Sequence, residues 1–237
     1  MIILNCNTGR MSNHKIMQAH VMAEALAHGE RWYIAPRNWF WKFEAATLGR
    51  IWNKCVRMMK PVEGSRNRCF HLLGLTIVHG WTELRNFESL KKYGDEIRGL
   101  FLTQRRRGAE IESNFGEGRM VGVHIRRMDY KEWKGGRYWY SNDVYERVMD
   151  EVRKALGEVK FIVFTDEPES LSPRLRDLND PMTTPERDQY LMSKCNYLIG
   201  PPSTFTAWAS FMGKVPLLHL MDGEQKVRLK DFNRQWE

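Results

Sequence analysis

After Met120 the sequence alternates short β-rich runs with segments of helical periodicity, and this order constrains the fold more than any other feature. The predicted strands cover 120–125, 159–165, 196–200 and 215–220, and the predicted helices cover 141–156, 186–195 and 203–212. Ser141 and Ser203 are suitable N-caps, and Gly157 and Gly213 stand where two of the helices should end. Strands that alternate with helices are typical of a parallel sheet covered by helices, so we predict a doubly wound α/β unit.

The first part of the chain follows this pattern less clearly. We predict a strand at 2–4, a loop to residue 13 and a helix at 12–28, whose apolar residues recur at helical spacing. The tryptophan-rich stretch at 31–110 shows no regular alternation, and we interpret it as mixed and mostly helical. The arginine- and glycine-rich stretch at 105–118 is the clearest boundary, which predicts two domains at 1–115 and 116–237.

The composition fits a folded, soluble protein, because 42% of the 237 residues are hydrophobic and 28% are charged. No apolar stretch approaches the ~18 residues that a membrane helix needs. The opening Met1–Asn5 lacks a basic leader and indicates a strand rather than a signal peptide. We therefore expect a cytoplasmic protein with at most peripheral membrane contact. The four cysteines form no C-x-x-C pair, so no metal site or disulfide framework is predicted.

Polar residues follow three of the predicted strands. His124, Arg126 and Asp129 lie at the end of the first strand, Asp166 follows the second, and Ser203 follows the third. In open α/β sheets, ligands bind outside the carboxyl ends of the strands. We therefore expect these side chains to line one crevice.

The chemistry of this crevice suits a diphosphate. A helix that begins at Ser203 offers free backbone N–H groups and the positive end of its dipole. Arg126 supplies a planar fork of N–H groups that can bind a phosphate through two hydrogen bonds. Taken singly, Ser203 could be only a helix cap, the arginine pair a surface ion-pair cluster, and His124 a core histidine. Their joint position at three strand ends favours a ligand site.

Three motifs resemble those of one enzyme superfamily. Residues 123–130, Val-His-Ile-Arg-Arg-Met-Asp-Tyr, are similar to the H-x-R-R-x-D motif of the α-1,2-, α-1,6- and protein O-fucosyltransferases. Residues 164–168 resemble the second motif of that superfamily, and residues 188–208 resemble the third. Residues 9–13, Gly-Arg-Met-Ser-Asn, are similar to the loop after the first strand in those enzymes.

The resemblance implies two Rossmann-like lobes of the GT-B type. The N-terminal, acceptor-side lobe at 1–115 would be abbreviated and partly helical, and the lobe at 116–237 would bind the nucleotide sugar. The implied reaction is the inverting transfer of fucose from GDP-fucose to a glycan acceptor, without a metal or another cofactor.

The resemblance also implies roles for individual residues. Arg126 would bind the β-phosphate beside His124, and Asp129 would orient the arginine pair. Asp188 would accept hydrogen bonds from the guanine. The remaining donor-binding residues would be Asp166, Ser203, Thr204 and Phe205, with Gly9 and Asn13 approaching from the other lobe.

An inverting transfer needs a base for the proton of the acceptor hydroxyl, and Asp129 and Glu132 are the two candidates that follow the arginines. Met128 stands where the α-1,2 branch commonly has glycine, so the sequence leaves the linkage open.

Two other functions compete with a fucosyltransferase. A nucleotide-sugar-binding protein without catalysis would keep the donor motifs and lack a base. A net charge of +8 and the Arg105–Arg107 run also suit a nucleic-acid-binding protein. Because no nucleic-acid-binding module is recognisable, we expect no nucleic-acid partner.

Overall fold

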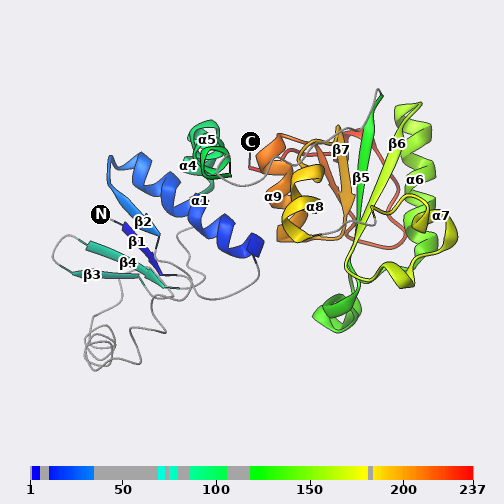
Figure 1. Cartoon of the computed structure of the whole chain (residues 1–237), viewed down its shortest axis with the longest axis horizontal. Helices are drawn as coiled ribbons and strands as arrows, with labels where there is room; N and C mark the ends of the chain where they lie inside the picture. Colours follow the sequence, from blue (N-terminus) through cyan, green and yellow to red (C-terminus); the bar gives the residue numbers. More distant parts are fainter. Residues whose placement is uncertain are drawn as a thin grey trace. The chain divides into compact units, whose positions relative to one another are not determined.

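The structure is a computed structural model that describes residues 2–5, 11–34, 69–72, 75–79, 86–105, 118–180 and 184–236. The chain divides into two compact units (Figure 1). Unit 1 comprises Met1–Gly108 with Trp236, and unit 2 comprises Ala109–Gln235 with Glu237.

Unit 2 contains a four-stranded parallel sheet with the order β6-β5-β7-β8. Its strands are β5 (Met120–Ile125), β6 (Lys160–Thr165), β7 (Tyr197–Gly200) and β8 (Leu217–His219). Its helices are α6 (Asn142–Leu156), α7 (Pro173–Arg176), α8 (Pro185–Met192) and α9 (Thr204–Gly213). The predicted α/β unit with a parallel sheet is therefore confirmed.

The strand order reverses between β5 and β7. From β5 the chain crosses to β6 on one side, and it then returns past β5 to form β7 on the other side. The loops that leave the carboxyl ends of β5 and β7 therefore diverge, and such a switch point is where open α/β sheets bind ligands.

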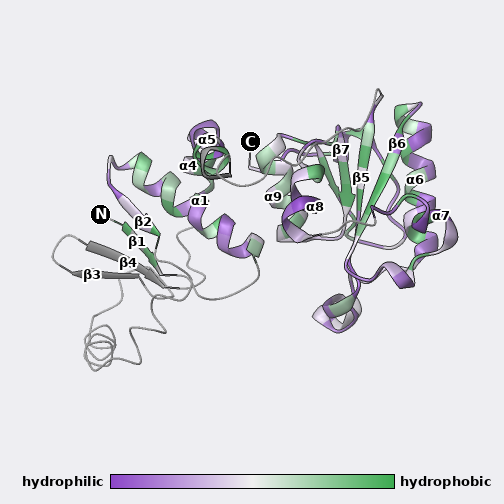
Figure 2. Cartoon of the chain, in the orientation of Figure 1, coloured by the Kyte–Doolittle hydropathy of each residue, from purple (hydrophilic) through white to green (hydrophobic). Residues whose placement is uncertain are grey.

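Both faces of this sheet are covered by helices. Val121, Val123 and Ile125 of β5 pack with α6 and α7, whereas Phe164 of β6 and Leu198 of β7 pack with α8 and α9. Figure 1 shows the two helix pairs on opposite faces, and Figure 2 shows the hydrophobic strands between them. All six residues of β5 are buried, as expected for a central parallel strand.

Two helix ends differ in detail from the sequence prediction. Ser141 occupies the N-cap position of α6, but its side chain makes no capping hydrogen bond. Helix α9 does end at Gly213, but the left-handed residue that terminates it is Lys214, with φ 52°. Gly213 is required for another reason, because a Cβ there would overlap the carbonyl oxygen of Ser193.

Unit 1 is also an α/β unit. Its sheet has the order β2-β1-β4-β3, in which β1 is parallel to both neighbours and β3 is antiparallel to β4. The strands are β1 (Ile2–Asn5), β2 (Trp32–Ile34), β3 (Cys69–Leu72) and β4 (Leu75–His79). The helices are α1 (Met11–Ala27), α4 (Phe87–Lys92) and α5 (Gly94–Arg105).

The strand and helix predicted for the first 30 residues of unit 1 are confirmed as β1 and α1. Residues 31–110 were predicted to be mixed and mostly helical, and the described part contains the helices α4 and α5 together with three strands, β2 to β4. The three strands were not predicted individually, because the sequence around them shows no regular alternation of short apolar runs with helical periods. Most of the tryptophan-rich segment lies outside the described residues. Among the described helices, none is long and apolar enough to cross a membrane.

Candidate active site

Arg126 is held at the carboxyl end of β5 by two carboxylates. Its Nη2 lies 2.5 Å from Oδ1 of Asp129, and its Nη1 lies 2.6 Å from Oδ2 of Asp166. The arginine side chain is 15% exposed, compared with 44% for Asp129 and 17% for Asp166. Its guanidinium carbon also lies 5.6 Å from the ring centroid of Tyr130. The predicted residues Arg126, Asp129 and Asp166 are thus brought together in one ion-pair cluster.

Arg127 points away from this cluster into the core. It is 1% exposed, and its guanidinium donates to the carbonyl of Tyr140 and to Oδ1 of Asn142. The guanidinium carbon lies 4.8 Å from the ring centroid of Trp139 and 5.7 Å from that of Tyr145. Burial lowers the pKa of Arg127 from its ordinary value. The contacts of its side chain therefore differ from the surface ion pair that the sequence left open for it.

Asp166 connects the ends of β5 and β6. Its Oδ1 accepts a hydrogen bond of 2.8 Å from the backbone N–H of Arg127, while its Oδ2 faces Arg126. One carboxylate therefore holds the backbone of one arginine and the side chain of the other. This contact fixes the direction in which each arginine leaves the strand.

Tyr130 joins the two loops at the switch point. It lies in the 3₁₀-helix η1 (Met128–Lys131), is 7% exposed, and donates from its hydroxyl to the carbonyl of Pro202 over 2.6 Å. Ser203 also hydrogen-bonds to this hydroxyl. Burial raises the pKa of Tyr130, so the phenol stays protonated at neutral pH. No role was predicted for Tyr130, although it directly follows Asp129 in the motif.

The N-terminus of α9 lies on the β7 side of the switch point. Ser203 is its N-cap, and its hydroxyl accepts a hydrogen bond of 3.1 Å from the N–H of Phe205. Thr204 is exposed in the first turn, where backbone N–H groups have no acceptor within the helix. A hydroxyl, unsatisfied N–H groups and the positive end of the helix dipole therefore stand beside the loop that carries Arg126.

His124 packs beneath this helix end. It is 4% exposed, and its ring centroid lies 5.2 Å from that of Phe205. Burial lowers the pKa of His124 to about 4, so the imidazole is neutral at physiological pH. Gly200 permits this packing, because a Cβ there would lie 3.1 Å from both the Cβ and the carbonyl oxygen of His124. The neutral ring could serve a ligand as a hydrogen-bonding group but not as a cation.

Asp188 is a buried carboxylate in the first turn of α8. It is 7% exposed, and its Oδ1 has no hydrogen-bond partner among the described residues. Burial and, to a smaller extent, the charge of Asp180 raise the pKa of Asp188, whereas Arg187 lowers it, and together these effects place the pKa at about 7. Helices α8 and α9 are linked by the side chain of Gln189, which donates to the carbonyl of Phe205 over 3.2 Å. An unsatisfied acceptor is thus held by the helix that packs on α9.

The other predicted site residues are less closely engaged. Glu132 is exposed where η1 meets the 3₁₀-helix η2 (Trp133–Gly136). Asn13 lies in the first turn of α1 in unit 1, and Gly9 lies outside the described residues. Within the described ranges, no group of three or more histidine, cysteine or acidic side chains is placed to bind a metal ion.

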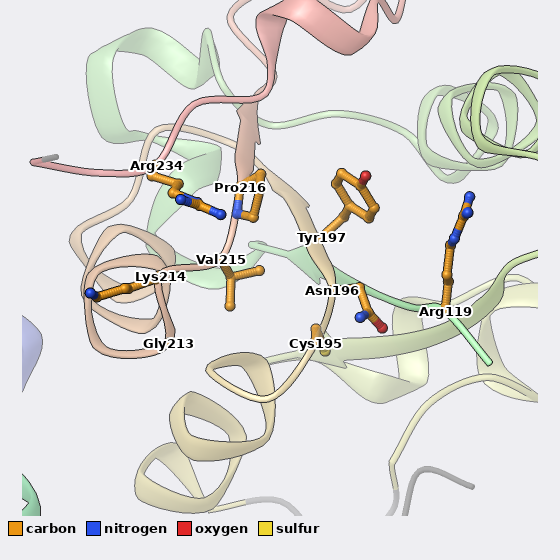
Figure 3. Close-up of a pocket in the computed structure, with 9 residues that line it drawn as sticks. All are labelled: Arg119, Cys195, Asn196, Tyr197, Gly213, Lys214, Val215, Pro216 and Arg234. Atoms are coloured by element: carbon orange, nitrogen blue, oxygen red, sulfur yellow. The ribbon is translucent and has the colours of Figure 1, made fainter. Parts of the chain in front are cut away.

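A pocket of about 310 Å³ lies at the amino ends of the strands of unit 2, opposite the end that carries Arg126 (Figure 3). Arg119, Asn196 and Pro216 line it, and each directly precedes or begins a strand. Arg119 also donates to the carbonyl of Leu156 at the C-terminus of α6. Basic side chains at this edge complement helix C-termini. None of the predicted site residues lines this pocket.

Comparison with known proteins gives a family and a fold. The model of glycosyl transferase family 11 matches residues 81–222, which include all three motifs after residue 119. A crystal structure of the α-1,6-fucosyltransferase NodZ soaked with GDP-fucose is 14% identical, with a TM-score of 0.51 over 98% of this chain and 96% of that chain. A structure of the fucosyltransferase NodZ from Bradyrhizobium is 15% identical, with a TM-score of 0.51 over 92% and 94% of the two chains. No curated protein matches the sequence.

The different surroundings of the two arginines predict different effects on stability. Arg127→Lys should lower the free energy of unfolding by about 2–4 kcal/mol, because it removes the donors that satisfy the buried carbonyl of Tyr140 and the half-buried side-chain oxygen of Asn142. Arg126→Lys should lower it by less than about 1 kcal/mol, because its ion pairs border solvent. Urea unfolding followed by circular dichroism measures both. Equal losses would contradict the assignment of Arg127 to the core.

Proposed function

The chain belongs to glycosyl transferase family 11, and on this premise we propose that it transfers fucose from GDP-fucose to a glycan acceptor with inversion at the anomeric carbon. The donor would bind at the switch point, beside the carboxyl ends of β5 and β7. A soaked NodZ structure among the similar folds supports this choice of donor, since that protein was prepared with GDP-fucose.

One observation carries the proposal. The hydrogen bond from Tyr130 to Pro202 joins the loop that holds Arg126 to the loop that begins α9. A guanidinium and a helix N-terminus are the features of this unit best suited to bind phosphate. The bond therefore holds them together at the carboxyl ends of β5 and β7. A diphosphate needs both, because negative charge develops on it as the sugar departs.

A phosphate that binds Arg126 has to compete with Asp129 and Asp166. Asp166 is also bonded to the backbone of Arg127, and it is the less exposed of the two carboxylates. Asp129 is 44% exposed, so its carboxylate can leave the ion pair and be solvated by water more easily than that of Asp166. We therefore assign Asp166 to orienting Arg126 and Asp129 to the exchange with phosphate.

Asp188 suits the recognition of guanine. The N1–H and N2 amino groups of guanine present two adjacent donors, and a carboxylate can accept from both. The buried oxygen of Asp188 without a partner is the kind of group that such a base would satisfy. Phe205 of α9 would contact the base. Its carbonyl accepts from Gln189 of α8, and its ring lies against that of His124.

In the transfer step, the acceptor oxygen forms a bond to the anomeric carbon while the bond from that carbon to the diphosphate breaks. The acceptor hydroxyl loses its proton to a carboxylate. Asp129 becomes available when phosphate takes its place on Arg126, whereas Glu132 is exposed in any case. These two residues stay the candidates for the base.

Nucleotide binding and release of fucose from the donor together distinguish the competing functions. We expect GDP to raise the melting temperature more than UDP, ADP or CMP, because a ligand that binds only the folded state stabilises it. EDTA should leave this shift unchanged, since basic groups and a helix N-terminus take the role of an ion. A shift abolished by EDTA and restored by manganese would contradict the proposed site. Release of fucose from labelled GDP-fucose separates an active enzyme from a protein that only binds the nucleotide sugar.

The pH dependence of GDP binding tests Asp188. Guanine binds the ionised carboxylate, so affinity should fall as the pH drops through the pKa of about 7. The fall from pH 8 to pH 6 should be roughly tenfold, the change in the ionised fraction for such a group. Calorimetric titrations with Asp188→Asn provide the control, because the phosphates of GDP titrate equally with both proteins. Inosine diphosphate, which lacks the N2 amino group, should bind more weakly to the wild type. An unchanged pH profile in Asp188→Asn would contradict the assignment.

A further inference from the structure

The loop after β5 carries an unusual share of the exposed apolar surface of unit 2. Residues 128–140, here called the motif loop, contain Met128, Trp133 and Trp139, which are 57%, 39% and 38% exposed. In the described part of unit 2, two other large hydrophobic side chains are exposed, Met221 and Leu229. Exposed aromatic side chains gathered in one place mark surfaces that bind other molecules.

The motif loop is anchored at both ends. At its start, Tyr130 is bonded to Pro202. At its end, the buried Arg127 binds the carbonyl of Tyr140, whose hydroxyl donates to the carbonyl of Leu220 over 2.8 Å. The exposed tryptophans therefore stand on a backbone that packing and hydrogen bonds fix in place.

Aromatic contacts extend outward from the donor crevice along this loop. The ring centroid of Trp133 lies 4.8 Å from that of Tyr130 and 5.5 Å from that of Tyr138. Tyr130 in turn contacts the guanidinium of Arg126. A continuous series of contacts thus connects the proposed phosphate-binding arginine to the exposed Trp133. Figure 1 shows the helical turns of this loop beyond the carboxyl end of β5.

Two cations accompany these rings. The ammonium of Lys134 lies 5.0 Å from the ring centroid of Trp133, and the guanidinium carbon of Arg137 lies 5.4 Å from that of Tyr138. Both side chains are exposed and can donate several hydrogen bonds. The loop thus combines an aromatic surface with hydrogen-bond donors around it.

This combination matches the chemistry of a sugar. One face of a pyranose ring presents C–H groups of slightly positive charge, which complement the negative face of an aromatic ring. Its hydroxyl and carboxylate oxygens accept hydrogen bonds from ammonium and guanidinium groups. We propose that the motif loop is the acceptor subsite, where a glycan contacts Trp133 while Lys134 and Arg137 bind its oxygens. This inference rests on the proposed function, because an acceptor must lie beside the donor.

The test uses the full chain with saturating GDP and an array of defined oligosaccharides. Wild type should retain a subset of the array, and Trp133→Ala should lose it, while Trp133→Phe retains part. In the transfer reaction with a retained glycan, Trp133→Ala should raise the acceptor KM roughly three- to tenfold, the range expected for one aromatic contact. Leu229→Ala, which removes an exposed apolar side chain elsewhere in unit 2, should behave as wild type.

The affinity for GDP shows whether the donor site survives each change. An unchanged GDP affinity in Trp133→Ala, together with loss of the glycan, supports the acceptor subsite. Loss of both affinities would mean that Trp133 only supports Tyr130, and this result overturns the inference. Glycan retention equal to that of wild type, or an array on which wild type retains nothing although it binds GDP, overturns it as well. A wild type that fails to bind GDP contradicts the proposed function instead.

Discussion

The contact of one carboxylate with two consecutive arginines organises this site. Asp166 accepts from the backbone of Arg127 and pairs with the side chain of Arg126, which ties the end of β6 to the end of β5. Neighbouring residues in extended backbone point in opposite directions. With the chain held at this point, the side chain of Arg126 remains at the carboxyl end of β5 and that of Arg127 enters the core. A proposed phosphate-binding group and a structural group are thus obtained from two residues of the same type.

The buried arginine stabilises what surrounds the site. The guanidinium of Arg127 donates to Tyr140 and Asn142 and lies against the rings of Trp139 and Tyr145. These contacts hold the end of the motif loop next to its start. Burying that charge is unfavourable, and burial accordingly lowers the pKa of the arginine. The hydrogen bonds and aromatic contacts offset this cost. Tyr130 then connects this loop to the start of α9, so the two features proposed to bind phosphate depend on the same packing.

Most strands and helices of unit 2 could be predicted from the sequence, because the signals that mark them are local. Apolar runs, helical periods and cap residues predicted all four strands and three of the four helices to within a few residues. The strand order was not predictable in this way. That β7 pairs with β5 rather than β6 depends on contacts between residues more than 70 positions apart, such as Val121 and Tyr197. The strands β3 and β4 of unit 1 were not predicted, because the sequence around them lacks the regular alternation with helical periods that marks the strands of unit 2.

The site itself was predicted in part. The motifs indicated Arg126, Asp129 and Asp166, and the structure brings these three together. Nothing local indicated that Arg127 would be buried, because its partners Tyr140 and Asn142 follow 13 and 15 residues later. The role of Tyr130 was also hidden, since Pro202 lies 72 residues away. Long-range hydrogen bonds of this kind become visible only once the strands are placed.

We propose that Arg126 binds the diphosphate of GDP and that Arg127 does not. Calorimetric titration of GDP into Arg126→Lys and Arg127→Lys, at a temperature at which both variants are folded, tests it most directly. Lysine keeps the charge but loses the planar pair of hydrogen bonds, so Arg126→Lys should weaken GDP binding by about tenfold to a hundredfold. Arg127→Lys should bind GDP nearly as the wild type does. An equal loss in both variants, or a larger loss in Arg127→Lys, would contradict the account.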